Sequence, residues 1–294
     1  MSISFFRCLA LLLLAALHAG AWAQAAPGRL RFVFGGNAGP GETAVAPDAR
    51  YSAALGHGFE GPGPGIGALA PVVAGPRRGA QALAPGEPQF FSVDLPEGAW
   101  RVTLTLGGTE QPSDTTVRAE VRRLVLQNVA TAAREVREAR FTVHVRTPRI
   151  QGGEGRAEGQ VQLNGTREAV GEAWNWDGRL TLELNGTRPV VQAIEIEPAQ
   201  VPQLFLLGDS TVADQSAEPY ASWGQMLPRF VGPGATVVSL AQSGETYRDS
   251  LARRRLDKIL SLARPGDVVL MQYGHNDQKQ IRYRALDTGA NDFL

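Results

Sequence analysis

Cysteine is almost absent from this sequence, which has one, Cys8, in 294 residues. Cys8 lies in an N-terminal segment with the features of an export signal: a positive charge at Arg7, the short apolar run CLALLLLAAL and small residues at Ala21–Ala23. We predict a signal peptide over residues 1–23; a membrane anchor is the alternative, but the run is too short to span a bilayer stably. The mature chain is then periplasmic or secreted, free of the membrane, and has no thiol for a disulfide, a nucleophile or a metal site.

An excess of either charge is also missing. The 29 basic and 29 acidic residues give a formal net charge of zero, which argues against a nucleic acid or an anionic membrane as partner. A phosphate-binding loop is missing too. The stretch GGNAGPGET has Gly36 and Gly41 at the required spacing, but Glu42 stands where that loop needs a lysine. We therefore predict no nucleotide site.

From about Leu30 to Pro198 the chain has β-type patterns. Val102, Leu104 and Leu106 alternate with smaller or polar residues, as in a half-buried antiparallel strand. Similar runs recur between turn residues without intervening helices, which predicts a β-sandwich over residues 24–200. These runs are RLRFVFGG, QFFSVDLPEGAWRVTLTLGG, TTVRAEVRRLVLQNVAT, ARFTVHVRTP, GQVQLNGTREAV and RLTLELNGTRPVVQAIEIEP.

Three details of this first part lead to separate predictions. The pentapeptide LNGTR occurs at residues 163–167 and 184–188, and Asn-Gly between alternating flanks predicts a hairpin turn at each place. The Gly-, Pro- and Ala-rich residues 61–89 predict a long irregular loop. Trp100, Trp174 and Trp176 are of a type that stacks on sugar rings, but we expect them in the core, except for one of Trp174 and Trp176.

The pattern changes from Pro202 onward. The continuous apolar runs QLFLLGD, ATVVSLAQSG and DVVLMQYG are typical of buried parallel strands. Between them, SWGQMLPRF and TYRDSLARRRLDKILSLARPGD have helical patterns. The order β-α-β-α-β predicts a parallel sheet with helices on its faces over residues 201–294. Arg253, Arg254 and Arg255 form a charge run that we expect on a solvated helix face.

Polar residues follow each of these predicted strands, at the edge where open parallel sheets bind ligands. Ser210 follows the first strand, Gly244 the second and Asn276 the third. Ser210 could be the nucleophile of an acyl transfer, given a base. The backbone N–H groups of Ser210 and Gly244 and the side-chain amide of Asn276 could form the oxyanion hole. Each residue alone also suits a turn or a helix cap, so the prediction depends on the three together.

Three further residues beside this set are expected to support it. Asp209 and Asp277 are predicted to fix their loops through hydrogen bonds to backbone amides instead of reacting. His275 directly precedes Asn276, and we expect it to pack or to contact substrate and not to transfer a proton.

Three ordered blocks resemble a known family. FLLGDSTVAD, AQSGET and QYGHND look like the first three blocks of the GDSL/SGNH hydrolases, and GDSTVADQSAEPYASWGQMLPRF is similar to their rhamnogalacturonan acetylesterase branch. DLPEGAWRVTLTLG, RRLVLQNVAT and FTVHVRTP resemble the β-rich N-terminal domain of bacterial members. The resemblance implies a galactose-binding-like β-sandwich followed by a partial SGNH-type α/β/α domain. It also implies a serine esterase that removes O-acetyl groups from a pectin-type polysaccharide, with no metal or cofactor.

The catalytic base of that family is missing from the sequence. It is a histidine in a later Asp-x-x-His block, whereas His57 and His144 have no aspartate three residues before them and His18 belongs to the leader. With only three sheet strands after Gln203, we expect a C-terminally truncated chain that is inactive alone. The alternatives are a non-catalytic glycan-binding protein with a degenerate hydrolase remnant, or an esterase for another acetylated polysaccharide.

Overall fold

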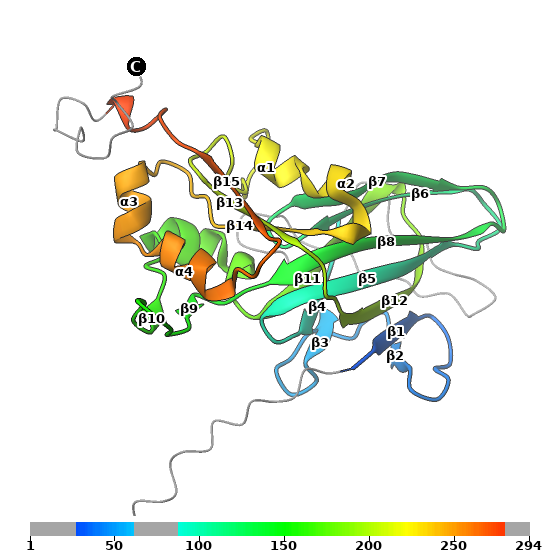
Figure 1. Cartoon of the computed structure of the whole chain (residues 1–294). Helices are drawn as coiled ribbons and strands as arrows, with labels where there is room; N and C mark the ends of the chain where they lie inside the picture. The colour runs from blue at the N-terminus through cyan, green and yellow to red at the C-terminus, as the bar shows by residue number, and fades with distance from the viewer. Residues whose placement is uncertain (1–27, 62–87, 280–294) are drawn as a thin grey trace, which may run out of the picture.

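A computed structural model of the chain describes residues 28–61 and 88–279 (Figure 1). The predicted signal peptide, nearly all of the predicted loop at 61–89 and the residues after Lys279 lie outside the described residues. The β-rich part, residues 28–198, contains β1 (Leu30–Phe34), β2 (Thr43–Val45), β3 (His57–Phe59), β4 (Gln89–Asp94), β5 (Gly98–Gly107), β6 (Ser113–Ala119), β7 (Arg123–Thr131), β8 (Val136–Val145), β9 (Arg149–Ile150), β10 (Gly159–Gln160), the π-helix η1 (Arg167–Gly171), the 3₁₀-helix η2 (Ala173–Asn175), β11 (Arg179–Arg188) and β12 (Val191–Pro198).

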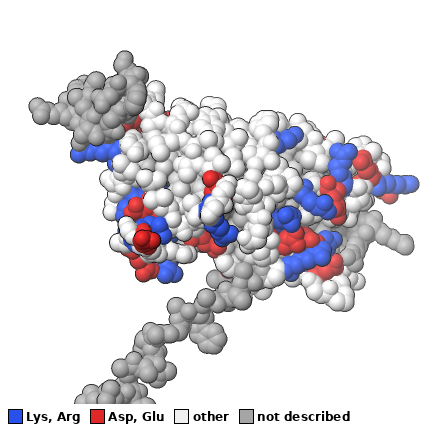
Figure 2. Space-filling view, viewed as in Figure 1, with Lys and Arg blue, Asp and Glu red and all other residues white. Residues whose placement is uncertain are grey.

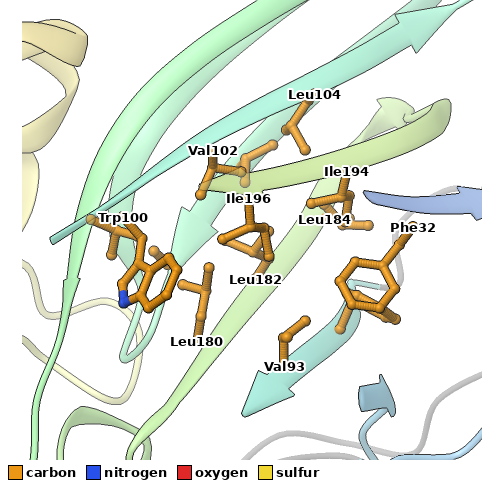
Figure 3. Close-up of a cluster of buried hydrophobic side chains, with 14 of the residues drawn as sticks. Phe32, Val93, Trp100, Val102, Leu104, Leu180, Leu182, Leu184, Ile194 and Ile196 are labelled. Carbon is orange, nitrogen blue, oxygen red and sulfur yellow. The ribbon is translucent and has the colours of Figure 1, made fainter. Parts of the chain in front are cut away.

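Two five-stranded sheets make up most of this part. Their strand orders are β2-β1-β12-β5-β8 and β3-β4-β11-β6-β7, and every pairing is antiparallel except that of β1 with β2. Side chains of both sheets meet in one hydrophobic cluster, where those of β5 face those of β11 (Figure 3). Val102, Leu104 and Leu106 are fully buried there, which confirms the predicted alternation. Burial of this apolar area on both sheets is the main stabilising term.

Both predicted Asn-Gly hairpin turns are wrong. At residues 163–167 the chain leaves the short β10 and enters η1, because the Glu168 side chain turns inward and accepts a hydrogen bond from the Asn164 N–H at 2.8 Å. At residues 184–188 the Asn-Gly pair lies inside β11, where the register to β6 shifts between Asn185 and Arg188. A Cβ on Gly186 would lie 2.2 Å from the carbonyl oxygen of Asp114, so the glycine permits a bulge and not a turn.

Residues 203–279 form an α/β part with a three-stranded sheet. Its elements are β13 (Gln203–Gly208), α1 (Trp223–Met226), α2 (Pro228–Val231), the 3₁₀-helix η3 (Gly232–Gly234), β14 (Thr236–Ser239), α3 (Tyr247–Ala252), α4 (Arg255–Leu262) and β15 (Val268–Gln272). The strand order is β14-β13-β15 and both pairings are parallel, as predicted. The structure thus confirms a β-rich chain with a parallel sheet at its end; the galactose-binding-like and SGNH assignments stay predictions.

The expected long helix before β15 is two helices. Arg254, with φ of 62°, separates α3 from α4. The prediction of a solvated arginine run is wrong for Arg255, which is fully buried, whereas Arg253 and Arg254 are half-buried. Among the tryptophans, Trp100 and Trp176 are buried as expected, and the half-buried Trp174 packs on Phe90 with ring centroids 5.1 Å apart.

The two parts pack against each other around β14 and through the helices of the α/β part. Strand β8 contacts β14 and η3, β7 contacts α1 and α2, and β9 contacts α4. Elsewhere β15 is exposed: all five of its residues are open to solvent, including Val268 (48%), Val269 (44%), Leu270 (37%) and Met271 (50%). The surface over the region of α1 and β15 carries few charged side chains, whereas charged groups gather at both ends of this face and α2 carries the exposed Arg229 (Figure 2). No helix of the described ranges is long and apolar enough to cross a bilayer.

Candidate active site

Ser210 lies in the tight turn that follows β13. Gly208 ends the strand, and a Cβ there would approach the carbonyl oxygen of Gln272 to 2.7 Å, so only glycine allows β13 and β15 to pair at this point. Asp209 is buried, and its Oδ1 accepts hydrogen bonds from the N–H and the hydroxyl of Thr211, each at 2.9 Å. The Ser210 side chain is half-buried, and its hydroxyl makes no hydrogen bond to another described residue. It is therefore open to a ligand.

Gly244 and Asn276 lie in the loops that follow β14 and β15. Gly244 is exposed and has φ of 84°, a conformation that favours glycine and turns the backbone at this position. Asn276 is buried and donates from Nδ2 to the Glu245 carbonyl oxygen at 3.0 Å. Asp277 is fully buried, and its carboxylate accepts from the backbone N–H groups of Tyr247 (3.1 Å) and Gly274 (3.2 Å).

Hydrogen bonds join the three loops at the carboxyl ends of the strands. Gln215 Nε2 donates to the Ser210 carbonyl oxygen at 2.8 Å and to Ser243 Oγ at 3.1 Å, which links the first loop to the second. Gln272 Nε2 at the end of β15 donates to Thr211 Oγ1 at 2.7 Å, and Asn276 links the third loop to the second. The predicted site residues thus share one edge of the sheet and one hydrogen-bonded network.

The described histidines do not pair with Ser210. His57 belongs to β3, in the β-rich part. Burial and the surrounding cations lower the pKa of His144 to about 3, and its ring lines a cavity of about 430 Å³ together with Gln203, at the opposite end of β13. His275 is exposed, and its Nε2 accepts a hydrogen bond from Lys279 Nζ at 2.9 Å. In the part of the chain that the structure describes, no histidine is hydrogen-bonded to the serine.

A buried ion cluster, which sequence reasoning missed, fixes the second loop. Arg255 donates to both carboxylate oxygens of Glu245 (2.8 and 2.7 Å) and to both of Glu168 in η1 (2.9 and 2.7 Å). All three side chains are at most 3% exposed. The Arg255 guanidinium and the Asn164 N–H lower the pKa of Glu168 despite its burial, so this carboxylate is ionised. Glu245 follows Gly244 directly, so the β-rich part holds this loop through Arg255.

A second buried contact, also missed, fixes the serine loop. Arg123, the first residue of β7, donates from Nε to Asp214 Oδ2 at 2.8 Å and from Nη2 to Asn175 Oδ1 at 2.6 Å. The preceding Arg122 donates from Nη1 to the Gln215 carbonyl oxygen at 3.0 Å. The only signal for this contact in the sequence was the block GDSTVAD itself, which ends at Asp214, four residues after Ser210.

Glu172, between η1 and η2, lies near the same loop. Burial, and then the carboxylates of Glu168 and Asp214, raise the pKa of Glu172 to about 7. The described ranges contain no group of three or more His, Cys, Asp and Glu side chains that could hold a metal ion. What the edge offers chemically is an open serine hydroxyl, a glycine amide and a carboxamide on a rigid, buried support.

Comparison with known proteins places the chain near esterases. No family model matches it. It is 29% identical over 261 residues to the uncharacterized esterase YxiM of Bacillus subtilis, covering 86% of this chain and 61% of that protein. It is 39% identical over 79 residues to the rhamnogalacturonan acetylesterase RhgT of the same organism, covering 26% of this chain and 34% of that protein.

The structural comparison gives a weaker likeness. The crystal structure of the Bacillus subtilis YxiM protein covers 87% of this chain at 24% identity, with a TM-score of 0.35. The chain spans about three fifths of the curated YxiM and a third of RhgT. The relatives that it matches in sequence are thus esterases by name, and RhgT is a rhamnogalacturonan acetylesterase.

Proposed function

We propose that this chain is part of an exported serine esterase that removes O-acetyl groups from a pectin-type polysaccharide such as rhamnogalacturonan. The observation that carries the proposal is the common edge at which Ser210, Gly244 and Asn276 follow three parallel strands. The sequence relatives, named as esterase and rhamnogalacturonan acetylesterase, support the same reaction. In the proposal the β-rich part is a galactose-binding-like β-sandwich and the α/β part is of the SGNH type.

The proposed reaction uses the three residues in turn. Ser210 Oγ loses its proton to the base and attacks the acetyl carbonyl carbon; the tetrahedral intermediate then collapses, the sugar oxygen leaves with that proton, and the acetyl group stays on the serine. The N–H groups of Ser210 and Gly244 and the Asn276 amide donate to the oxyanion of that intermediate. Asp209, Asp277 and Glu245 act through the loops that they hold. Water then releases acetate and restores the serine.

The base that takes the proton of Ser210 belongs to polypeptide beyond the described residues in this proposal. The support is β15, an apolar parallel strand with all five residues exposed, because strands of parallel sheets are normally buried on both faces. Further strands and helices packed against β15 would cover it and bring an Asp-x-x-His pair to the serine. Without that pair the serine hydroxyl is a weak nucleophile, and this chain alone is inactive.

The test is acetate release from acetylated rhamnogalacturonan by the chain extended with whatever its coding frame supplies after codon 294. Turnover should disappear in Ser210→Ala and persist in Ser216→Ala, a serine of the same loop. Loss of activity by about 10⁴-fold or more is expected, because the nucleophile carries the covalent step. An extended chain that binds the polysaccharide but never turns it over would favour the glycan-binding alternative.

A further inference from the structure

The π-helix η1 brings a charged segment of the β-rich part to the candidate active site. Helices of this type are rare, are usually a single turn and occur often at functional sites. Here the turn holds Glu168 inward against Arg255, with four hydrogen bonds of 2.7–2.9 Å joining that arginine to Glu168 and Glu245. Because Arg167 directly precedes Glu168, the buried cluster also fixes where Arg167 lies.

Arg167 lies against the loop of the predicted oxyanion hole. Its Nη1 donates to the Ser243 carbonyl oxygen at 3.3 Å, and a Cβ built on Gly244 would lie 3.9 Å from the same nitrogen. The side chain is exposed, and no carboxylate of the described residues forms an ion pair with it. The other guanidinium N–H groups are therefore free to bind a ligand beside Gly244.

The acidic groups around this edge are withdrawn from solvent. Asp209, Glu245 and Asp277 are at most 2% exposed, and each accepts hydrogen bonds within the protein. Glu172 is 5% exposed. In contrast, Arg167 and Lys279 are exposed. The edge thus presents cations outward and keeps its carboxylates inside, an arrangement that attracts an anionic substrate.

We propose that Arg167 forms a carboxylate-binding subsite beside Gly244, which selects an acetylated polysaccharide that contains uronic acid over a neutral one. The inference rests on the proposed esterase function and adds a specificity-determining residue to it, supplied by the β-rich part. A guanidinium suits this role because its planar N–H groups match a carboxylate in a bidentate pair. The acetylated sugar would then lie over Gly244 and Ser210 with the acidic group on Arg167.

The test compares binding of tri-galacturonate and of xylotriose, a neutral trisaccharide, to the full chain by calorimetry. Arg167→Ala should raise the Kd for tri-galacturonate about 10-fold, the usual effect of a charge-assisted pair, and leave that for xylotriose unchanged. Arg167→Lys should retain part of the preference, because it keeps the charge and loses the fork. Arg264→Ala, which removes an exposed arginine at the opposite end of the sheet, is the matched control and should change neither Kd.

Several outcomes would overturn the inference. The subsite is refuted if Arg167→Ala changes both affinities alike, changes neither, or acts no differently from Arg264→Ala. The absence of any preference for tri-galacturonate in the unmodified protein also refutes it. A selective loss in Arg167→Ala supports the subsite even where acetate release fails, so binding separates this inference from the proposed function. In the extended, active chain the same variant should raise KM for the acidic polymer more than it lowers kcat.

Discussion

The β-rich part and the α/β part differ in how far their strands bury apolar side chains. In the first, two sheets cover each other, and the inward side chains of β5 and β11 are at most 2% exposed. In the second, β13 is covered but its neighbour β15 leaves four apolar residues 37–50% exposed. The α/β part contacts the β-rich part at β14 and through its helices, and it is open to solvent along β15. The site loops are held by contacts with the β-rich part.

This difference shows how site loops can be held in place on a sheet whose last described strand is exposed. The loops that carry Ser210 and Gly244 are each tied to the β-rich part by a buried arginine, Arg123 for the first and Arg255 for the second. Buried ion pairs stabilise little against apolar replacements, but loss of one partner is costly because it leaves a buried charge without its counter-ion. Order at these two loops therefore depends on the first part, with one further hydrogen bond to the serine loop from Gln272 of the edge strand.

The strongest way to break the comparison is Arg255→Ala. Glu168 and Glu245 would be left buried without their cation, which should lower the free energy of unfolding by about 3–5 kcal/mol. Urea unfolding measures the loss, and amide exchange should rise in residues 236–262 more than in β5. Arg253→Ala is the control: its half-exposed ion pair with Glu245 is worth about 1 kcal/mol or less. Equal losses in both variants would contradict the role of the buried cluster.

A matched pair of leucines sharpens the comparison. Leu182→Ala in β11 empties a site that is 1% exposed and should cost about 2–5 kcal/mol of unfolding free energy. Leu270→Ala in β15 should cost less, about 1–2 kcal/mol in this chain, because 37% of that residue is already exposed. The two values come from the same denaturation assay. In the extended chain, the cost at Leu270 should approach that at Leu182; no rise would argue against further strands on β15.

The last prediction concerns pH. Glu172 keeps its proton up to about pH 7 in the folded chain but only to about 4.5 when unfolded. Between these values the unfolded state binds fewer protons, so the free energy of unfolding falls as pH rises, by about 3 kcal/mol at most. Thermal unfolding at pH 4.5, 6 and 7.5 measures this slope. Glu172→Gln, which cannot ionise, should flatten it, and an unchanged slope would rule out Glu172 as its source.

Local sequence patterns predicted the regular elements well. Alternation identified β5, and continuous apolar runs identified β13 and β14, because each pattern reflects the number of faces that a strand buries. The run at β15 also predicted a strand correctly, but its predicted burial is wrong, since all five residues are exposed. The turn rule failed at both Asn-Gly pairs, since Glu168 and the close approach of Asp114 to Gly186 decide the backbone there. The approach of Asp114 to Gly186 joins residues far apart in sequence, and Glu168 is held inward by Arg255, 87 residues later, so neither cause has a local signature.

The residues of the candidate site also divide into those that the sequence predicted and those that only the structure places there. Ser210, Gly244 and Asn276 follow from a rule on strand ends, which needs only the order of the elements. Arg255 was missed because three consecutive arginines on a helix normally face solvent, and nothing near them in sequence indicates the two carboxylates that bury one of them. Arg167 lies 77 residues before Gly244, in a segment whose pattern predicted a strand, so only the folded chain places it at the site.

The Arg255 cluster has a consequence for recombining such proteins. The segment around η1 precedes β11 and β12 in the chain, yet its buried carboxylate pairs with a cation of the last described helix. In a hybrid that joins the α/β part to the β-rich part of another protein, Arg255 would be buried with Glu245 but without Glu168. The two parts therefore cannot be exchanged independently, and residues 159–175 would have to be transferred together with the α/β part in any successful exchange.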